Sequence, residues 1–122
     1  MAARPRRARR GVSFDAVRDL ALALPGMEEG TSYGTPAFRV RKKLVARLKE
    51  DGESMVLMVT MDEKEALLLA DPKVYFTTPH YDGYAAILVR FAEVDRRELA
   101  ELIEGVWRRV APKRVVAAYD DA

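Results

Sequence analysis

The chain has 122 residues, of which 49% are hydrophobic and 33% are charged, and this size and composition are typical of a single globular domain. It contains no cysteine, which excludes disulfides, thiol nucleophiles and cysteine metal sites. No apolar run approaches the roughly 18 residues of a membrane-spanning helix, and the start of the chain lacks the apolar segment of a secretory signal. We therefore expect a cytoplasmic protein that does not bind membranes.

Positive charge is concentrated at the start of the sequence. Five of the first ten residues are arginines, which leaves 16 of the 21 basic side chains against 19 acidic ones in the remainder. The arginines are Arg4, Arg6, Arg7, Arg9 and Arg10. Residues 1–12 have no apolar periodicity, so we predict a disordered, arginine-rich arm. Two roles are open for it: a solvated tail, or a segment that contacts nucleic acid or another polyanion.

The first half of the chain predicts one helix and three strands. Ser13 is a favourable N-cap for a helix over residues 14–24, where apolar residues recur at three- and four-residue spacing. Residues 31–40 and 43–50 have the composition and alternation of two strands joined by a tight turn. Residues 54–60 are apolar on both sides, which predicts a central strand.

The second half predicts two helices around one or two strands. A short helix starts at Thr60 or Asp62, and residues 73–83 are expected to form a short strand and a loop. Residues 85–94 are strongly β-forming, and Asp95 caps the longest helix. Because connections this short force consecutive strands to pair antiparallel, we predict an α+β fold with helices packed on one face of an antiparallel sheet.

A basic hairpin is the strongest functional signal. Six basic residues and no acidic one lie between positions 39 and 49, namely Arg39, Arg41, Lys42, Lys43, Arg47 and Lys49. Strand alternation predicts that Arg39, Arg41, Arg47 and Lys49 share the exposed face, with Lys42 and Lys43 near the tip. Such a ribbon is suited to bind the phosphates of DNA, although runs of charge are also common on solvated faces.

Gly34 and Pro36 interrupt the first strand of this hairpin. Proline donates no backbone hydrogen bond and glycine permits a positive φ, so we predict a kink or an edge position here. The kink would turn polar side chains toward the loop that contains the only histidine. We expect these residues, Ser32, Tyr33, His80, Tyr81 and Asp82, to form a cleft. Protection of a sheet edge is the alternative reason for the kink.

Support for catalysis is weak. His80 is the only histidine, and neither a nucleophile nor metal-ligand spacing accompanies it. The sequence contains neither of the usual glycine-rich phosphate-binding loops. We therefore expect no enzymatic activity, no cofactor and no metal.

Three segments carry a resemblance to a known family. LPGMEEGTSYGTPAFRVRKKLVARL (24–48), HYDGYAAILVRF (80–91) and ELIEGVWRRVAPKR (101–114) resemble the MmcQ/YjbR family. The most specific matches, in the family's order, are Glu29, Ser32, Gly34, Pro36, Phe38 and Lys43. Ala85 and Ala86 depart from the pattern, because many relatives carry tryptophan or proline there.

The resemblance implies a CyaY-like (frataxin-like) fold, described for this family as a double-wing DNA-binding motif. It also implies a small bacterial protein without an established enzymatic activity. Residues 13–114 would form the single MmcQ/YjbR-like domain, with residues 115–122 as a C-terminal tail. Two functional hypotheses follow: a non-enzymatic protein that binds DNA phosphates through the basic hairpin, or a module that binds a small molecule or a protein in the cleft.

Overall fold

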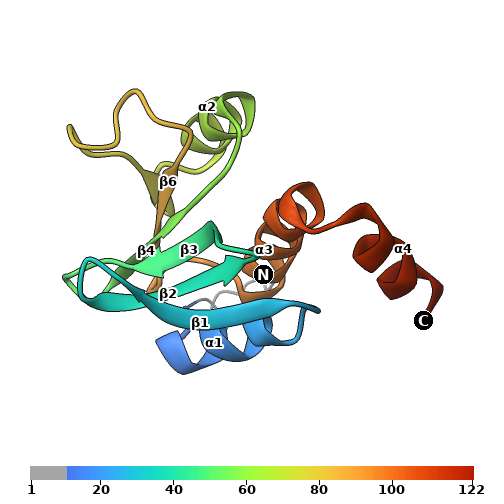
Figure 1. The fold of residues 1–122 in the computed structure, drawn as a ribbon. Coiled ribbons are helices and arrows are strands. Elements are labelled where there is room, and N and C mark those ends of the chain that lie inside the picture. Colours follow the sequence, from blue (N-terminus) through green and yellow to red (C-terminus); the bar gives the residue numbers. More distant parts are fainter. Residues whose placement is uncertain (1–10) are drawn as a thin grey trace, which may run out of the picture.

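The computed structural model describes residues 11–122, which form one antiparallel sheet with four helices (Figure 1). The helices are α1 (Phe14–Leu22), α2 (Met61–Ala70), α3 (Arg96–Val110) and α4 (Lys113–Asp121). The strands are β1 (Met27–Ser32), β2 (Thr35–Val40), β3 (Lys43–Leu48), β4 (Ser54–Leu57), β5 (Tyr75–Phe76) and β6 (Ile87–Arg90). They are ordered β1-β2-β3-β4-β6-β5, and each neighbouring pair is antiparallel. The predicted α+β class is confirmed.

The predicted helix starts are also confirmed. The Ser13 hydroxyl accepts a hydrogen bond from the Ala16 amide, and the Asp95 carboxylate accepts one from the Glu98 amide. Thr60 begins α2 with a reciprocal capping box. Each cap satisfies an amide that has no partner within its helix, so these short-range sequence signals determine where the helices begin.

Helices α1 and α3 pack on the same face of the sheet and enclose the main core. Val17 of α1 and Ile103 of α3 join strand residues such as Phe38 in one buried cluster. Trp107 is fully buried in it, and its Nε1 donates a 2.8 Å hydrogen bond to the Pro25 carbonyl. The opposite face carries a smaller cluster of strand residues, covered in part by Tyr81 from the loop before β6.

The first predicted strand is two strands. Residues 27–32 form β1, which the sequence analysis missed, and Tyr33 and Gly34 form the turn that connects it to β2. Both turn residues have positive φ, 53° and 81°, as a two-residue type I′ hairpin turn requires. Gly34 is therefore needed for the turn. Pro36 lies just before the β2–β3 ladder begins at Ala37, so its missing N–H interrupts no pair of that ladder.

A β-bulge changes the alternation that was predicted for the hairpin. Phe38 pairs with Ala46 and Arg39 pairs with Leu44, which leaves Val45 as the extra residue. Val45 and Ala46 both enter the main core, whereas Leu44 does not. The simple alternation predicted for the strand over residues 43–50 is therefore wrong, because one inserted residue reverses the orientation of side chains beyond it.

Both ends of the predicted domain extend further than expected. The amides of Gly11 and Val12 donate to the carbonyls of Val94 and Phe91, so these two residues belong to the folded body and not to the predicted arm. The other predicted arm residues, 1–10, lie outside the described part of the chain. Most of the predicted C-terminal tail is helical, because α4 spans Lys113–Asp121 and projects beyond the end of α3 (Figure 1). Across residues 11–122, every helix is too short or too polar to cross a bilayer.

Candidate nucleic-acid interface and polar pocket

Five of the six basic residues predicted for the hairpin separate into two groups at opposite ends of β3. Arg41 and Lys42 form the β2–β3 turn, and Lys43 follows it; all three are exposed. Arg47 and Lys49 lie at the other end of the strand. Arg47 is only 5% exposed, so the prediction that it points outward is wrong. Its neighbours across the sheet are Ala37 and Val56, on the face that the loop before β6 covers.

Arg39 belongs to neither group. It is half-buried in β2, and its Nη1 donates a 3.1 Å hydrogen bond to the Thr31 carbonyl on the neighbouring strand β1. This contact lies across the surface of the sheet. Arg39 therefore contributes to the packing of the β1–β2 hairpin.

A groove of about 510 Å³ lies between the β2–β3 turn and the junction of α3 with α4. Its charged lining residues are all cationic: Arg41, Lys43, Arg108, Arg109 and Lys113. We call it the basic groove. The turn contributes Arg41, the first residue of β3 contributes Lys43, and the end of α3 and the start of α4 contribute the others. Tertiary folding therefore joins the hairpin to a basic segment far along the sequence.

The groove cations differ in their partners. Arg108 forms ion pairs with Glu104 at 2.9 Å and Asp120 at 2.7 Å. The hydrogen bonds that Arg108 donates to Asp120 and Glu104 raise the pKa of Arg108, and the bond to Asp120 lowers the pKa of that carboxyl. Arg109 donates to the Met58 carbonyl at 2.7 Å. Within residues 11–122, the side chains of the remaining groove cations form no hydrogen bond or ion pair. These cations are Arg41, Lys43 and Lys113.

The β2–β3 turn holds its basic residues in an unfavourable backbone conformation. Arg41 and Lys42 have φ values of 50° and 74°, which are the left-handed values that a type I′ turn requires. Asn-Gly is the usual pair in such turns, and other residues there cost on the order of 1 kcal/mol each. Two exposed cations are therefore presented at a position where stability alone would favour other residues.

Helix α4 begins at the groove without a side-chain cap. Its N-cap residue is Pro112, whose side chain accepts no hydrogen bond. In the first turn of α4, the amides of Val115 and Val116 both donate hydrogen bonds to the Pro112 carbonyl. The amides of Lys113 and Arg114 precede them and have no such partner among the described residues. A helix N-terminus of this kind favours anions through its free amides and its dipole.

A second, smaller cavity of about 290 Å³ lies at the other end of β3. Its lining residues are Tyr33, Arg47, Lys49, Glu50, His80 and Tyr81. We call it the Arg47 pocket. The structure thus brings together three residues of the predicted cleft, Tyr33, His80 and Tyr81. The other two, Ser32 and Asp82, do not line the pocket.

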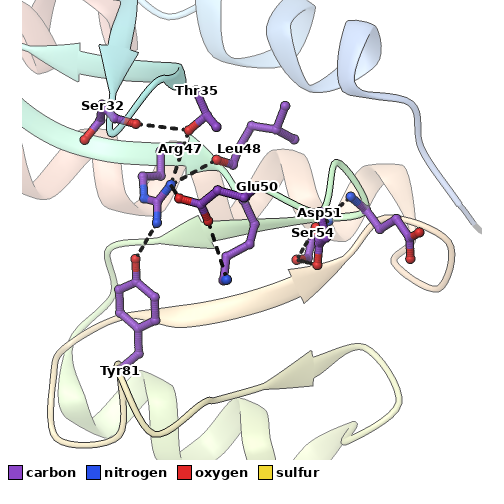
Figure 2. A network of polar contacts seen from close by, with 10 residues as sticks. Ser32, Thr35, Arg47, Leu48, Glu50, Asp51, Ser54 and Tyr81 are labelled. Atoms are coloured by element: carbon purple, nitrogen blue, oxygen red, sulfur yellow. Dashed lines mark hydrogen bonds and ion pairs between the residues drawn. The ribbon is translucent and has the colours of Figure 1, made fainter.

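Arg47 is held by contacts on several sides (Figure 2). Its Nη2 donates to the Tyr81 hydroxyl at 2.9 Å. Its Nη1 lies 3.2 Å from both Thr35 Oγ1 and the Leu48 carbonyl and 3.4 Å from Glu50 Oε2. Burial alone would lower the pKa of Arg47, but the contacts with Tyr81 and Glu50 reverse this effect and raise it. The guanidinium is therefore a fixed positive charge beneath the pocket.

A buried lysine fixes the loop that supplies His80 and Tyr81. Lys64 of α2 is 5% exposed, and its Nζ donates to the carbonyls of Tyr81 at 2.6 Å and Tyr84 at 2.8 Å. These bonds satisfy the buried ammonium and attach the loop to α2. The His80 ring then packs edge-on against Tyr81, with centroids 4.7 Å apart.

Sequence reasoning missed several residues of both sites. Arg108, Arg109 and Lys113 were not predicted to join the hairpin, although the basic run at the end of the longest helix was a usable signal. Glu50 was also missed at the pocket. It lies just beyond the acid-free stretch, in the turn after β3.

The fold and these two sites define a small α+β protein with a basic groove at one end of the sheet and a polar pocket at the other. Its sequence places it in the YjbR family, whose family model matches residues 22–109. The MmcQ/YjbR identification made from the sequence is therefore confirmed.

Individual relatives support the family and the fold. The chain is 55% identical over 56 residues to uncharacterized proteins of Mycobacterium tuberculosis and Mycobacterium bovis. The matched region covers 46% of this chain and 43% of each of those proteins. A crystal structure of a Deinococcus radiodurans protein with a DUF419 domain has a similar fold, with a TM-score of 0.68 and 22% identity over 80% of this chain and 78% of that one.

Proposed function

We propose that this protein is a non-enzymatic DNA-binding protein that contacts phosphates through the basic groove. The observation that carries the proposal is a groove whose charged lining consists of five cations, three of which make no ion pair or hydrogen bond within residues 11–122. Elsewhere the folded part of the chain has more acids than bases. Positive charge gathered on one surface of such a body is typical of an electrostatic binding site for a polyanion.

The geometry suggests how a phosphate backbone would lie. One phosphate would accept hydrogen bonds from the uncapped start of α4, with the side chain of Lys113 beside it. The β2–β3 turn would reach a neighbouring phosphate with Arg41 and Lys43. Phosphate contacts position a protein on DNA without reading its bases. Sequence-independent binding with a strong salt dependence is therefore expected.

This proposal revises the hairpin hypothesis. The turn and the residue after it, Arg41, Lys42 and Lys43, keep their predicted role. Arg39, Arg47 and Lys49 lose theirs, because Arg39 and Arg47 are occupied by contacts within the fold and Lys49 faces the pocket. A DNA-binding protein would work in the bacterial cytoplasm, and the absence of cysteine fits that reducing compartment. The CyaY-like classification also stays a prediction.

The decisive experiment measures the salt dependence of binding to a short DNA duplex. The test variant replaces Arg41, Lys43 and Lys113 with alanine. Since each neutralised phosphate contributes roughly −0.9 to the slope of log affinity against log salt concentration, the variant should flatten that slope by up to about 3 units. Fluorescence anisotropy between about 50 and about 200 mM salt gives this slope.

The matched control removes the same charge elsewhere. Lys73, Arg96 and Arg97 are exposed, and the two arginines lie at the opposite end of α3 from the groove. Their replacement with alanine should change the slope much less. Equal effects of the two triple variants would show that only net charge matters and would refute the groove.

The arginines at the start of the chain are tested separately. Removing residues 1–10 from the parent and from both triple variants separates the arm from the groove. If the shortened protein no longer binds duplex DNA at low salt, the binding belongs to the arm and the groove proposal fails. If the difference between the two triple variants persists in the shortened protein, the groove itself binds DNA.

A further inference from the structure

We infer that the Arg47 pocket binds a small molecule consisting of a flat ring with one anionic group. This inference goes beyond DNA binding, because the pocket lies at the opposite end of β3 from the basic groove. It rests on four observations: a buried guanidinium with a spare donor, a net positive lining, exposed aromatic rings and a strained tyrosine.

The anionic group would be recognised by Arg47. The bonds of its guanidinium within residues 11–122 use Nη1 and Nη2 and leave Nε without a partner. No fully buried side-chain nitrogen or oxygen in this part of the chain lacks a partner. Nε is therefore reached by solvent, and Arg47 is one of the residues that line the pocket. A rigid, always-charged guanidinium with a free N–H is suited to bind carboxylate or phosphate.

The charges of the lining favour a single anion. Arg47 and Lys49 are positive and Glu50 is negative, so the ionised lining residues sum to one positive charge. Glu50 lies 3.4 Å from Nη1 of Arg47 and 3.6 Å from Nζ of Lys49. Both cations lower the pKa of Glu50, after the larger effect of its own backbone hydrogen bond. Glu50 therefore stays charged and limits the pocket to ligands of low negative charge.

The ring would be recognised by the aromatic side chains at the pocket. Tyr33 is 82% exposed, and the Arg47 guanidinium carbon lies 5.2 Å from its ring centroid. The exposed ring of His80 lines the pocket from the loop before β6. Flat aromatic ligands stack on such rings through contact between the two π-faces. A volume of about 290 Å³ limits the ligand to a small one.

The backbone of Tyr33 supports a functional role for its ring. Tyr33 occupies the first central position of the β1–β2 turn with φ of 53°, where asparagine is much preferred before glycine. Its side chain gains little burial in return, since most of its surface is exposed. A bulky residue in this region is a strained outlier, and such outliers concentrate at binding sites.

The test uses two acids that each carry one negative charge, nicotinate and adenosine 3′,5′-cyclic monophosphate, with nicotinamide and adenosine as their neutral counterparts. Titrations of ¹⁵N-labelled protein should show saturable amide shifts at residues 31–35, 47–50 and 79–84. At least one acid should bind about tenfold more tightly than its neutral counterpart, since the anion adds a charge-assisted hydrogen bond. Which acid binds distinguishes a carboxylate from a phosphate ligand.

Two variants test the ring contact. Tyr33→Asn creates the favoured Asn-Gly turn, so it should raise the thermal midpoint while weakening binding of the acid about tenfold. His80→Ala should also weaken binding and serves as an independent variant. Tyr84→Ala is the control, because Tyr84 is exposed nearby but does not line the pocket.

Several results would overturn the inference. The first is that neither acid gives saturable shifts at about 10 mM, or that the shifts are confined to the basic groove. The second is that an acid and its neutral counterpart bind with equal affinity. The third is that the Tyr33→Asn variant is folded and binds the acid with unchanged affinity. The DNA salt slope should not change in that variant. The pocket and the groove can therefore fail separately.

Discussion

The hydroxyl of Tyr81 accepts a 2.9 Å hydrogen bond from Nη2 of Arg47, which joins β3 to a loop 34 positions further along the chain (Figure 2). Arg47 is almost completely buried, and the two Nη atoms of its guanidinium donate to partners within the protein. This single contact therefore connects the stability of the sheet to the position of the loop that forms the pocket.

Replacing Tyr81 with phenylalanine should destabilise the protein by about 1.5 to 3 kcal/mol, because a buried charged donor loses its acceptor. Urea unfolding measures the change. Tyr84→Phe is the control: Tyr84 is 63% exposed and its hydroxyl makes no hydrogen bond within residues 11–122, so its loss should have little effect. Equal stability of the two variants would mean that the Arg47 contact contributes nothing to folding.

The β2–β3 turn predicts a conflict between stability and binding. The double substitution Arg41→Asn and Lys42→Gly installs the preferred type I′ pair in place of two residues with positive φ. The free energy of unfolding should rise by about 1 kcal/mol or more, whereas the DNA salt slope should flatten by up to about 2 units. Calorimetry and anisotropy give the two quantities.

Tyr33→Asn is the matched control for this turn. It makes the same type of correction in the other hairpin, so it should stabilise the protein without changing the salt slope. A stabilised turn variant that binds DNA as well as the parent would exclude Arg41 and Lys42 from the interface.

Breaking the ion pair between Arg108 and Asp120 should make the DNA salt slope steeper, whereas the turn substitutions should flatten it. Asp120→Asn removes the 2.7 Å partner of a groove cation and should steepen the DNA salt slope by about 1 unit. Asp121→Asn makes the same change in charge one residue away, where no ion pair is formed within residues 11–122. If both variants steepen the slope equally, Arg108 does not contact DNA.

Trp107 predicts the largest loss of stability. It is fully buried, packs against Tyr119 with ring centroids 4.9 Å apart, and donates to the Pro25 carbonyl. Trp107→Ala should cost about 3 to 5 kcal/mol, and Trp107→Phe should cost less because it retains most of the ring volume. Thermal unfolding at the parent's midpoint would contradict a core role for this residue.

Features encoded by neighbouring residues were predictable from the sequence. The caps at Ser13, Thr60 and Asp95 each depend on an amide three residues away, so local patterns reveal them. Strand β1 was not predictable in the same way. Its sequence, MEEGTS, has few β-forming residues, and within it only Met27 is buried.

The candidate sites depended on contacts between distant segments. The burial of Arg47 requires Tyr81 and a bulge at Val45, and neither the distant partner nor the extra residue appears in a simple alternation. The groove likewise forms only when Lys113 reaches the β2–β3 turn. The charge pattern thus identified a basic segment of the sequence, but the tertiary fold determines which of its residues lie together in one site.

The two outer strands of the sheet have a consequence for association between copies of the chain. β1 is one edge and carries Glu28 and Glu29, whose charges would meet in a sheet continued from one molecule to the next. β5, the other edge, is only two residues long and offers few backbone groups to pair. Charged or very short edges are the usual protection against strand-to-strand aggregation. Exposed backbone at either margin is therefore a poor template for fibril growth.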